Sequence, residues 1–215
     1  MVLAGDVIQL ASNATRVIKK WGPVLEQIAS NSAQPDVMRL QNSKGEVLVE
    51  QQLPSHNAGF PIVYTNRGLA QKYMYEYALT LGVRFQFGAR IKEFFEEEGC
   101  AGIYVDGQKH VADVVIAADG VHSKAHTLTT GKPPIPISSG FAVYRAWFPL
   151  EELKGDPLLE EIFESKEDLM KVWIGPDTHG IVVTNTTLKA VTCFLTHKVT
   201  QRIRIHVQLL RIELT

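Results

Sequence analysis

The chain has 215 residues, 45% of them hydrophobic, and a formal net charge of -1 at pH 7. This composition supports a substantial core, whereas the charge gives no electrostatic reason to bind nucleic acid or an anionic membrane surface. Two cysteines, Cys100 and Cys193, are too few for a disulfide framework or a cysteine-rich metal site.

The opening residues 1–10 do not resemble a secretory leader, because they contain Asp6 and no basic residue. No apolar run reaches the roughly 20 residues that a membrane-spanning helix requires. The sequence therefore predicts a cytoplasmic protein without a membrane span.

The first predicted element is a helix over residues 12–21, with Ser12 or Asn13 as its N-cap. A short second helix is expected over residues 23–30. Alternating apolar residues and a central Asn-Ser-Lys-Gly turn then predict a β-hairpin over residues 37–51.

A longer amphipathic helix is expected to begin near Arg67 and to stop at Gly82, with Thr65 or Asn66 as its cap. Arg67 would lie in the first turn. A planar guanidinium beside a helix N-terminus suits a phosphate or another fixed oxygen acceptor. The alternative is an arginine that simply faces solvent.

Further strands are expected over residues 83–87 and 90–95, and a hairpin joins residues 102–105 to residues 109–111. The acidic run that follows the second strand, residues 96–98, is expected to be a solvated loop.

Val114, Val115 and Ile116 form a β-branched run that lacks an alternating polar face and is followed by small residues, and this predicts a strand covered on both sides within residues 113–118, as in a parallel sheet. Asp119-Gly120 follows at its carboxyl end. Ligands gather at such ends in open α/β sheets, and Gly120 allows a close backbone approach. Asp119 and Gly120 are therefore candidate ligand contacts, or they merely end the strand.

Beyond this point, the proline-rich residues 131–137 predict a linker. Residues 140–149 alternate like a strand and carry Arg145, which either contacts a ligand or lies on an exposed face. A surface helix is expected within residues 151–170, a strand and turn over residues 171–177, and a weak edge strand over residues 198–210.

Three of these stretches resemble FAD-dependent aromatic-ring monooxygenases, the salicylate- and p-hydroxybenzoate-hydroxylase-like flavoproteins. Residues 113–123 resemble the second flavin motif of that family, in which an Asp-Gly pair follows a buried strand. Residues 64–69 resemble its His-Arg-x-x-Leu helix start, with Asn66 in place of the His and Arg67 as the Arg, and residues 144–146 resemble its Tyr-Arg-Gly segment. The order of the intervening strands also matches.

The resemblance implies a mixed α/β fold, with a Rossmann-like FAD/NAD(P)-binding domain and a mixed β-sheet substrate domain. It implies FAD as cofactor, NAD(P)H as reductant, and the transfer of one oxygen atom from O2 to a small aromatic or polyketide-like substrate. Arg67, Asp119 and Gly120 would contact FAD. Arg145 would position the substrate and steer a phenolate-like ring.

The family's Gly-x-Gly-x-x-Gly turn and its later Gly-Asp-Ala-Ala-His motif are absent from this sequence. The chain is therefore expected to be truncated at both ends. Residues 1–130 would form a partial FAD-binding domain, residues 131–185 a partial substrate-binding sheet, and residues 186–215 a divergent tail. The alternative function is a catalytically inactive remnant or an interaction module.

Other chemistries lack their motifs. The sequence has no Gly-x-Ser-x-Gly elbow, no P-loop and no His-Glu-x-x-His metal spacing. No metal site is predicted, and a nicotinamide-only dehydrogenase is disfavoured because the phosphate-binding glycine turn is missing.

Overall fold

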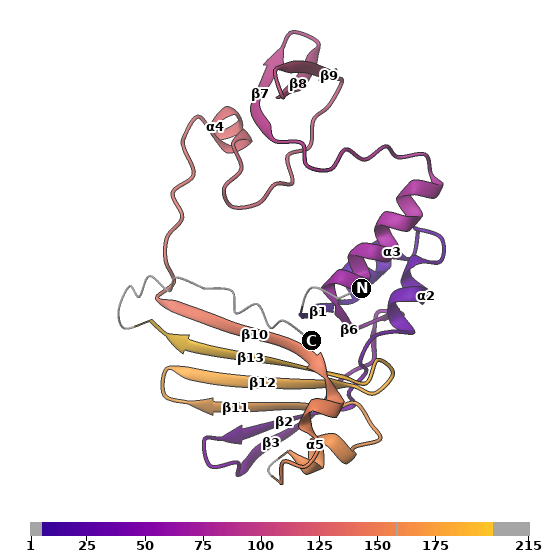
Figure 1. The fold of residues 1–215 in the computed structure, drawn as a ribbon, viewed down its shortest axis with the longest axis vertical. Coiled ribbons are helices and arrows are strands. Elements are labelled where there is room, and N and C mark those ends of the chain that lie inside the picture. The colour runs from indigo at the N-terminus through magenta and orange to yellow at the C-terminus, as the bar shows by residue number, and fades with distance from the viewer. Residues whose placement is uncertain (1–5, 158, 200–215) are drawn as a thin grey trace, which may run out of the picture. The chain divides into compact units, whose positions relative to one another are not determined.

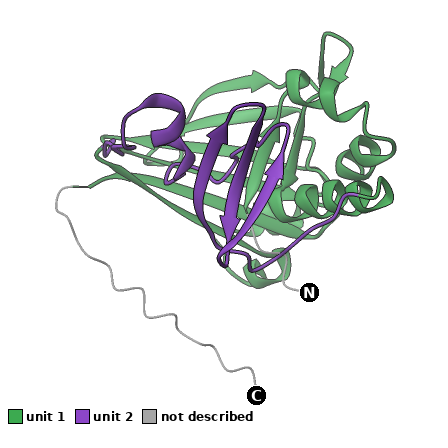
Figure 2. Cartoon of the chain, turned by 90° about the horizontal axis from the view of Figure 1, so that it is seen from above, with its two compact units in different colours: residues 1–82, 140–215 green, residues 83–139 purple. Residues whose placement is uncertain are grey.

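A computed structural model describes residues 6–157 and 159–199 of the chain (Figure 1). The chain divides into two compact units. Unit 1 comprises Met1–Gly82 and Gly140–Thr215, and unit 2 comprises Val83–Ser139 (Figure 2). Helices and strands mix in the chain as the resemblance implies, so the predicted α/β class is confirmed.

Unit 1 is built on a six-stranded mixed sheet in the order β10-β13-β12-β11-β2-β3. The contact between β11 and β2 is parallel, and all other neighbours are antiparallel. The strands are β10 (Phe141–Pro149), β13 (Ala190–Lys198), β12 (Thr178–Asn185), β11 (Met170–Gly175), β2 (Val37–Asn42) and β3 (Val47–Gln52).

The alternation of side chains gives this sheet two different faces. On one face, Met170 and Val183 pack with Val7 and Ala33. On the other face, Val191 packs with residues of η1 (Leu150–Leu153) and α5 (Glu160–Glu164). The sheet is therefore covered on one side by short helices, whereas Val7 and Ala33 contact part of the other side, here called the open face.

The remaining part of unit 1 packs three helices around two antiparallel strands. These elements are β1 (Val7–Leu10), β6 (Val63–Asn66), α1 (Ser12–Ile18), α2 (Val24–Ala29) and α3 (Arg67–Thr80), with a small β4 (His56–Asn57) and β5 (Phe60–Pro61) pair beside them. Their core contains fully buried Val24, Ile28 and Val63.

The predicted cap of α3 is confirmed, because the side chain of Asn66 accepts a hydrogen bond of 3.1 Å from the backbone N–H of Leu69. The predicted cap of α1 is wrong. Its N-cap is Ala11, which makes no side-chain cap bond, and Asn13 accepts from the neighbouring N–H of Ala14 instead.

Unit 2 holds a three-stranded antiparallel sheet in the order β7-β8-β9. The strands are β7 (Ile91–Glu97), β8 (Cys100–Val105) and β9 (Gln108–Ala112), followed by α4 (Ala125–Thr130). The predicted hairpin is therefore confirmed. The acidic run is only partly a loop, because β7 extends through its first two residues.

Two other strand predictions in unit 2 are wrong. Residues 83–87 and 113–118 form no strand in the described chain, and Val114 and Ile116 are 72% and 85% exposed. A strand buried on both faces needs hydrogen-bonded neighbours and covering layers, which the described residues do not supply. The apolar run alone could not provide them.

The surface helix expected within residues 151–170 is interrupted in the structure. Only η1 and α5 form, and Gly155, with a φ of 82°, and Pro157 separate them. The linker over residues 131–137 contains no helix or strand, as predicted.

Strand β13 lies within the range that the sequence assigned to a divergent tail. It pairs along its whole length with β10, and β12 pairs on its other side. The sheet thus continues to Lys198. The predicted edge strand over residues 198–210 falls almost entirely outside the described residues.

Across the described residues, no helix is both long and apolar enough to cross a membrane. Within the same part of the chain, no cluster of histidine, cysteine and carboxylate side chains could hold a metal ion.

Candidate functional site

An apolar cavity of about 650 Å³ lies over the open face of the six-stranded sheet. Aliphatic side chains and Phe194 form most of its wall, and a few polar groups interrupt it. Its lining consists of Val7, Ile8, Gln9, Met38, Leu53, Tyr64, Val143, Arg145, Met170, Val172, His179, Ile181, Val183, Phe194 and Thr196. Apolar walls with few polar groups are typical of small-molecule sites.

A second cavity, of about 260 Å³, is polar and shares Arg145 with the first. Asp6, Arg67, Ala146 and Trp147 complete its lining. Two guanidinium groups and one carboxylate therefore meet beside the apolar cavity.

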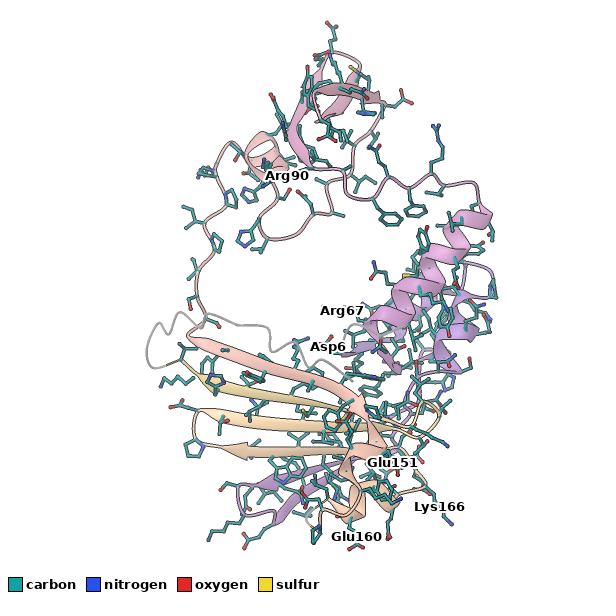
Figure 3. The ribbon with its side chains drawn as sticks, in the orientation of Figure 1. Asp6, Arg67, Arg90, Glu151, Glu160 and Lys166 are labelled. Carbon is teal, nitrogen blue, oxygen red and sulfur yellow. The ribbon has the colours of Figure 1, made fainter. Side chains whose placement is uncertain are left out.

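Asp6 joins the two arginines. Its side chain is only 7% exposed, its Oδ2 accepts a hydrogen bond from Nη1 of Arg145, and its Oδ1 lies 3.7 Å from Nε of Arg67. The backbone N–H of Arg67 also donates to the carbonyl oxygen of Asp6 at 3.0 Å. Figure 3 shows Asp6 and Arg67 together at the start of α3.

The local fold explains this meeting. Strands β1 and β6 pair so that Val7 lies opposite Asn66, which places Asp6 beside the first residue of α3. Arg145 arrives from the middle of β10, where it pairs with Phe194 of β13. The Arg145 guanidinium carbon lies 5.1 Å from the centre of the Phe194 ring, a cation–π distance.

Burial raises the pKa of the Asp6 carboxyl group, but the hydrogen bond from Arg145, a backbone hydrogen bond and the positive charges of Arg145 and Arg67 together bring this pKa below its ordinary value of 3.8. Asp6 is therefore ionised at neutral pH. Its environment favours the charged form because both cationic partners are held close to it.

This pKa shift predicts an acid-dependent contribution to stability. Because the folded-state pKa is lowered, the contribution is complete above pH 3.8 and is lost as the pH falls through the folded-state pKa. We expect Asp6→Asn to lower the free energy of unfolding by about 1 kcal/mol near neutral pH, since its arginine partners are half-exposed. Urea unfolding at several pH values checks this: the difference between the two proteins should shrink in acid, and a constant difference contradicts it.

Of the four residues that the sequence singled out, the structure brings Arg67 and Arg145 together through Asp6. Asp119 and Gly120 belong to unit 2. There Asp119 directly precedes a turn that Gly120 opens, with the carbonyl oxygen of Gly120 accepting a hydrogen bond of 2.9 Å from the N–H of Ser123. Gly120 has a φ of 87°, a backbone conformation that glycine adopts without strain.

Sequence reasoning missed Asp6 as a site residue. Its signal is weak, because a single aspartate near the start of a chain is usually solvated. Its burial depends on pairings with residues 60 or more positions away, as in Asp6 to Arg67 and Asp6 to Arg145.

The mixed α/β fold of this chain is similar to that of several solved structures, some of them in complex with FAD. Among solved structures, CtdE in complex with FAD and a substrate matches 93% of this chain and 49% of its own, with a TM-score of 0.86 and 30% identity. FqzB matches 91% of this chain and 45% of its own, with a TM-score of 0.78 and 31% identity. HpxO of Klebsiella pneumoniae, at 19% identity and a TM-score of 0.69, shares the fold.

Curated proteins named as monooxygenases are similar in sequence to most of this chain. Asperlicin C monooxygenase of Petromyces alliaceus is 36% identical over 90% of this chain and 42% of its own length. The FAD-dependent monooxygenase fmqB of Aspergillus fumigatus is 34% identical over 84% of this chain and 44% of its own. No protein-family model matches the chain.

The predicted resemblance to FAD-dependent monooxygenases is therefore confirmed in both sequence and fold. The chain spans less than half the length of these curated relatives.

Proposed function

We propose that this chain supplies the substrate sheet and part of the flavin site of an FAD-dependent monooxygenase. The reaction would hydroxylate a small aromatic or polyketide-type molecule with NAD(P)H and O2. The observation that carries this proposal is the position of Arg145, which lines both the apolar cavity and the smaller cationic cavity. One wall thus serves two adjoining sites.

The side chains of the smaller cavity suit part of FAD. Its lining contains two guanidinium groups against one carboxylate, and the side chain of Arg67 is 63% exposed, so its donors are accessible to a ligand. Guanidinium donors match phosphate and fixed carbonyl oxygens. FAD, when bound, would supply the electron transfer from NAD(P)H and the activation of O2.

The chain's own residues would bind and orient. Arg67 would donate to FAD, and Asp119 and Gly120 would contribute further contacts from unit 2, with residues 1–130 as part of the FAD-binding domain. Arg145 would position the substrate, while the aliphatic wall of the larger cavity would exclude water from it.

The names of the relatives support a natural product as substrate. Asperlicin C monooxygenase and notoamide E oxidase are named for such compounds. The apolar wall of the larger cavity agrees with a mainly hydrophobic small molecule, since few polar groups interrupt it.

Titration of the purified chain with FAD, followed by flavin fluorescence, tests the proposal. We expect Arg67→Ala to weaken FAD binding about tenfold or more, because a charge-assisted hydrogen bond is lost. Arg67→Lys keeps the charge but loses the planar donors, so its FAD affinity should lie between those of the parent chain and Arg67→Ala. Arg16→Ala is the matched control, since Arg16 is exposed on α1 and lines neither cavity.

Two results would contradict this assignment. Equal FAD affinities for the parent chain and Arg67→Ala would remove Arg67 from the flavin site. A well-folded chain that binds no FAD would favour the second candidate, an inactive remnant or interaction module. The apolar side chains that unit 2 exposes, Val114 and Ile116 among them, are the observation in favour of that alternative.

A further inference from the structure

Arg145 is the only residue with a permanent charge among the described residues that line the larger cavity. An uncompensated guanidinium there would favour anionic ligands. However, Arg145 is hydrogen-bonded to Oδ2 of Asp6, so the charge on this wall depends on both residues.

Asp6 has few other partners in the described structure. Its side chain is buried, and its Oδ1 makes no hydrogen bond, although Arg67 lies 3.7 Å away. A buried carboxylate retains its charge only when cations stabilise it. Asp6 and Arg145 therefore form a close ion pair, with Arg67 as a second, more exposed cation.

The arrangement also fixes the direction of the Arg145 side chain. Asp6 holds one side of the guanidinium, and the ring of Phe194, which lines the larger cavity, lies against it at 5.1 Å. A long, flexible side chain gains a defined orientation from two such contacts.

We propose that Asp6 is a positioning residue that holds Arg145 against Phe194 and neutralises its charge at the wall of the larger cavity. The cavity then presents oriented N–H donors without a net positive charge, and Arg67 supplies the excess positive charge to the smaller cavity. The proposal rests on the proposed function only in treating the larger cavity as a ligand site.

Two ligands of nearly the same shape test whether Asp6 neutralises Arg145 at the wall of the larger cavity. Benzoate and benzamide have nearly the same shape but differ by one charge, so the ratio of their dissociation constants reports the electrostatic character of the cavity. It is measured for the parent chain, Asp6→Asn, Arg145→Gln and the double variant. Asparagine keeps an oxygen that can accept from Arg145, and all four proteins retain His179 in the wall.

We expect the preference for benzoate over benzamide to rise about tenfold in Asp6→Asn, where Arg145 loses its counter-charge. It should fall about tenfold in Arg145→Gln, where Asp6 keeps only the more distant Arg67 as a counter-charge, and it should return to the parent value in the double variant. An unchanged ratio in Asp6→Asn, or a double variant that resembles Arg145→Gln, would overturn the proposal, because Arg145 alone would then set the preference.

Urea unfolding of the same four proteins gives a second measurement that needs no ligand. If Asp6 and Arg145 stabilise each other, the effects of their substitutions on the free energy of unfolding are coupled. The double variant should then lose less stability than the sum of the losses in the two single variants. Additive losses would overturn the proposal. FAD titration separates this test from the proposed function: a chain that binds no FAD but shows opposite ratio shifts contradicts the flavin site and supports the role of Asp6.

Discussion

Replacement of Ile181 by tryptophan is expected to weaken the binding of aromatic ligands to the larger cavity by about tenfold or more. Ile181 lies on β12, between Val172 of β11 and Phe194 of β13 in the pairing of the sheet, and all three side chains line the cavity. An indole at this position would occupy space that a ligand needs. We expect benzamide binding to weaken by about tenfold or more, since a steric clash leaves no comparable pose.

The control for this change is Leu195→Trp. Leu195 lies on β13 between Phe194 and Thr196, so its side chain is on the opposite face of the sheet; it is 51% exposed and does not line the cavity. The same side chain added there should leave benzamide affinity unchanged. Isothermal titration of both variants makes the comparison, with FAD titration as a check on the smaller cavity. Benzamide affinity in Ile181→Trp equal to that of the parent chain would show that ligands bind elsewhere.

The largest expected loss of stability follows from Ile28→Ala. Ile28 lies on α2, is 0% exposed and packs with Val24 and Val63 in the helical core of unit 1. Removal of a buried isoleucine side chain leaves a cavity and costs about 2–5 kcal/mol. Because Val63 belongs to β6, which precedes Arg67, this core also supports the candidate site.

Val17→Ala is the matched control, since Val17 lies on α1 and is 47% exposed. We expect its free energy of unfolding to change by about 0.5 kcal/mol or less. Urea unfolding measures the free energy of unfolding of both variants. Hydrogen exchange at the backbone amides of α2, which belongs to unit 1, then reports the stability of unit 1 separately from that of unit 2. A loss in Ile28→Ala no larger than that in Val17→Ala would show that this helical core contributes little.

Local sequence signals predicted the elements that local interactions stabilise. The hairpins of β2 with β3 and of β8 with β9 depend on alternation and on turn residues close in the chain. The start of α3 depends on Asn66, whose side chain reaches a backbone N–H three residues later. Arg67 and Arg145 were identified by their resemblance to short family motifs.

The failed predictions concern segments whose structure depends on distant partners. Residues 113–118 have the composition of a buried strand, yet Val114 and Ile116 are exposed because no described strand pairs with them. The partners of β13, which lies between β12 and β10, are likewise distant in the chain or set by the folded sheet. Alternation alone does not reveal which strands a segment will join.

The sequence by itself determined the class of the protein, the helix start at Arg67 and the strand that carries Arg145, because these depend on residues close together in the chain. Only the tertiary structure decided that Asp6 joins both arginines, and that Arg145 forms a wall common to two cavities. The reason is physical. Asp6 is buried and ionised because of its contacts with Arg67, 61 positions away, and with Arg145, 139 positions away. Strands β1, β6 and β10 bring these three residues together only when the chain has folded.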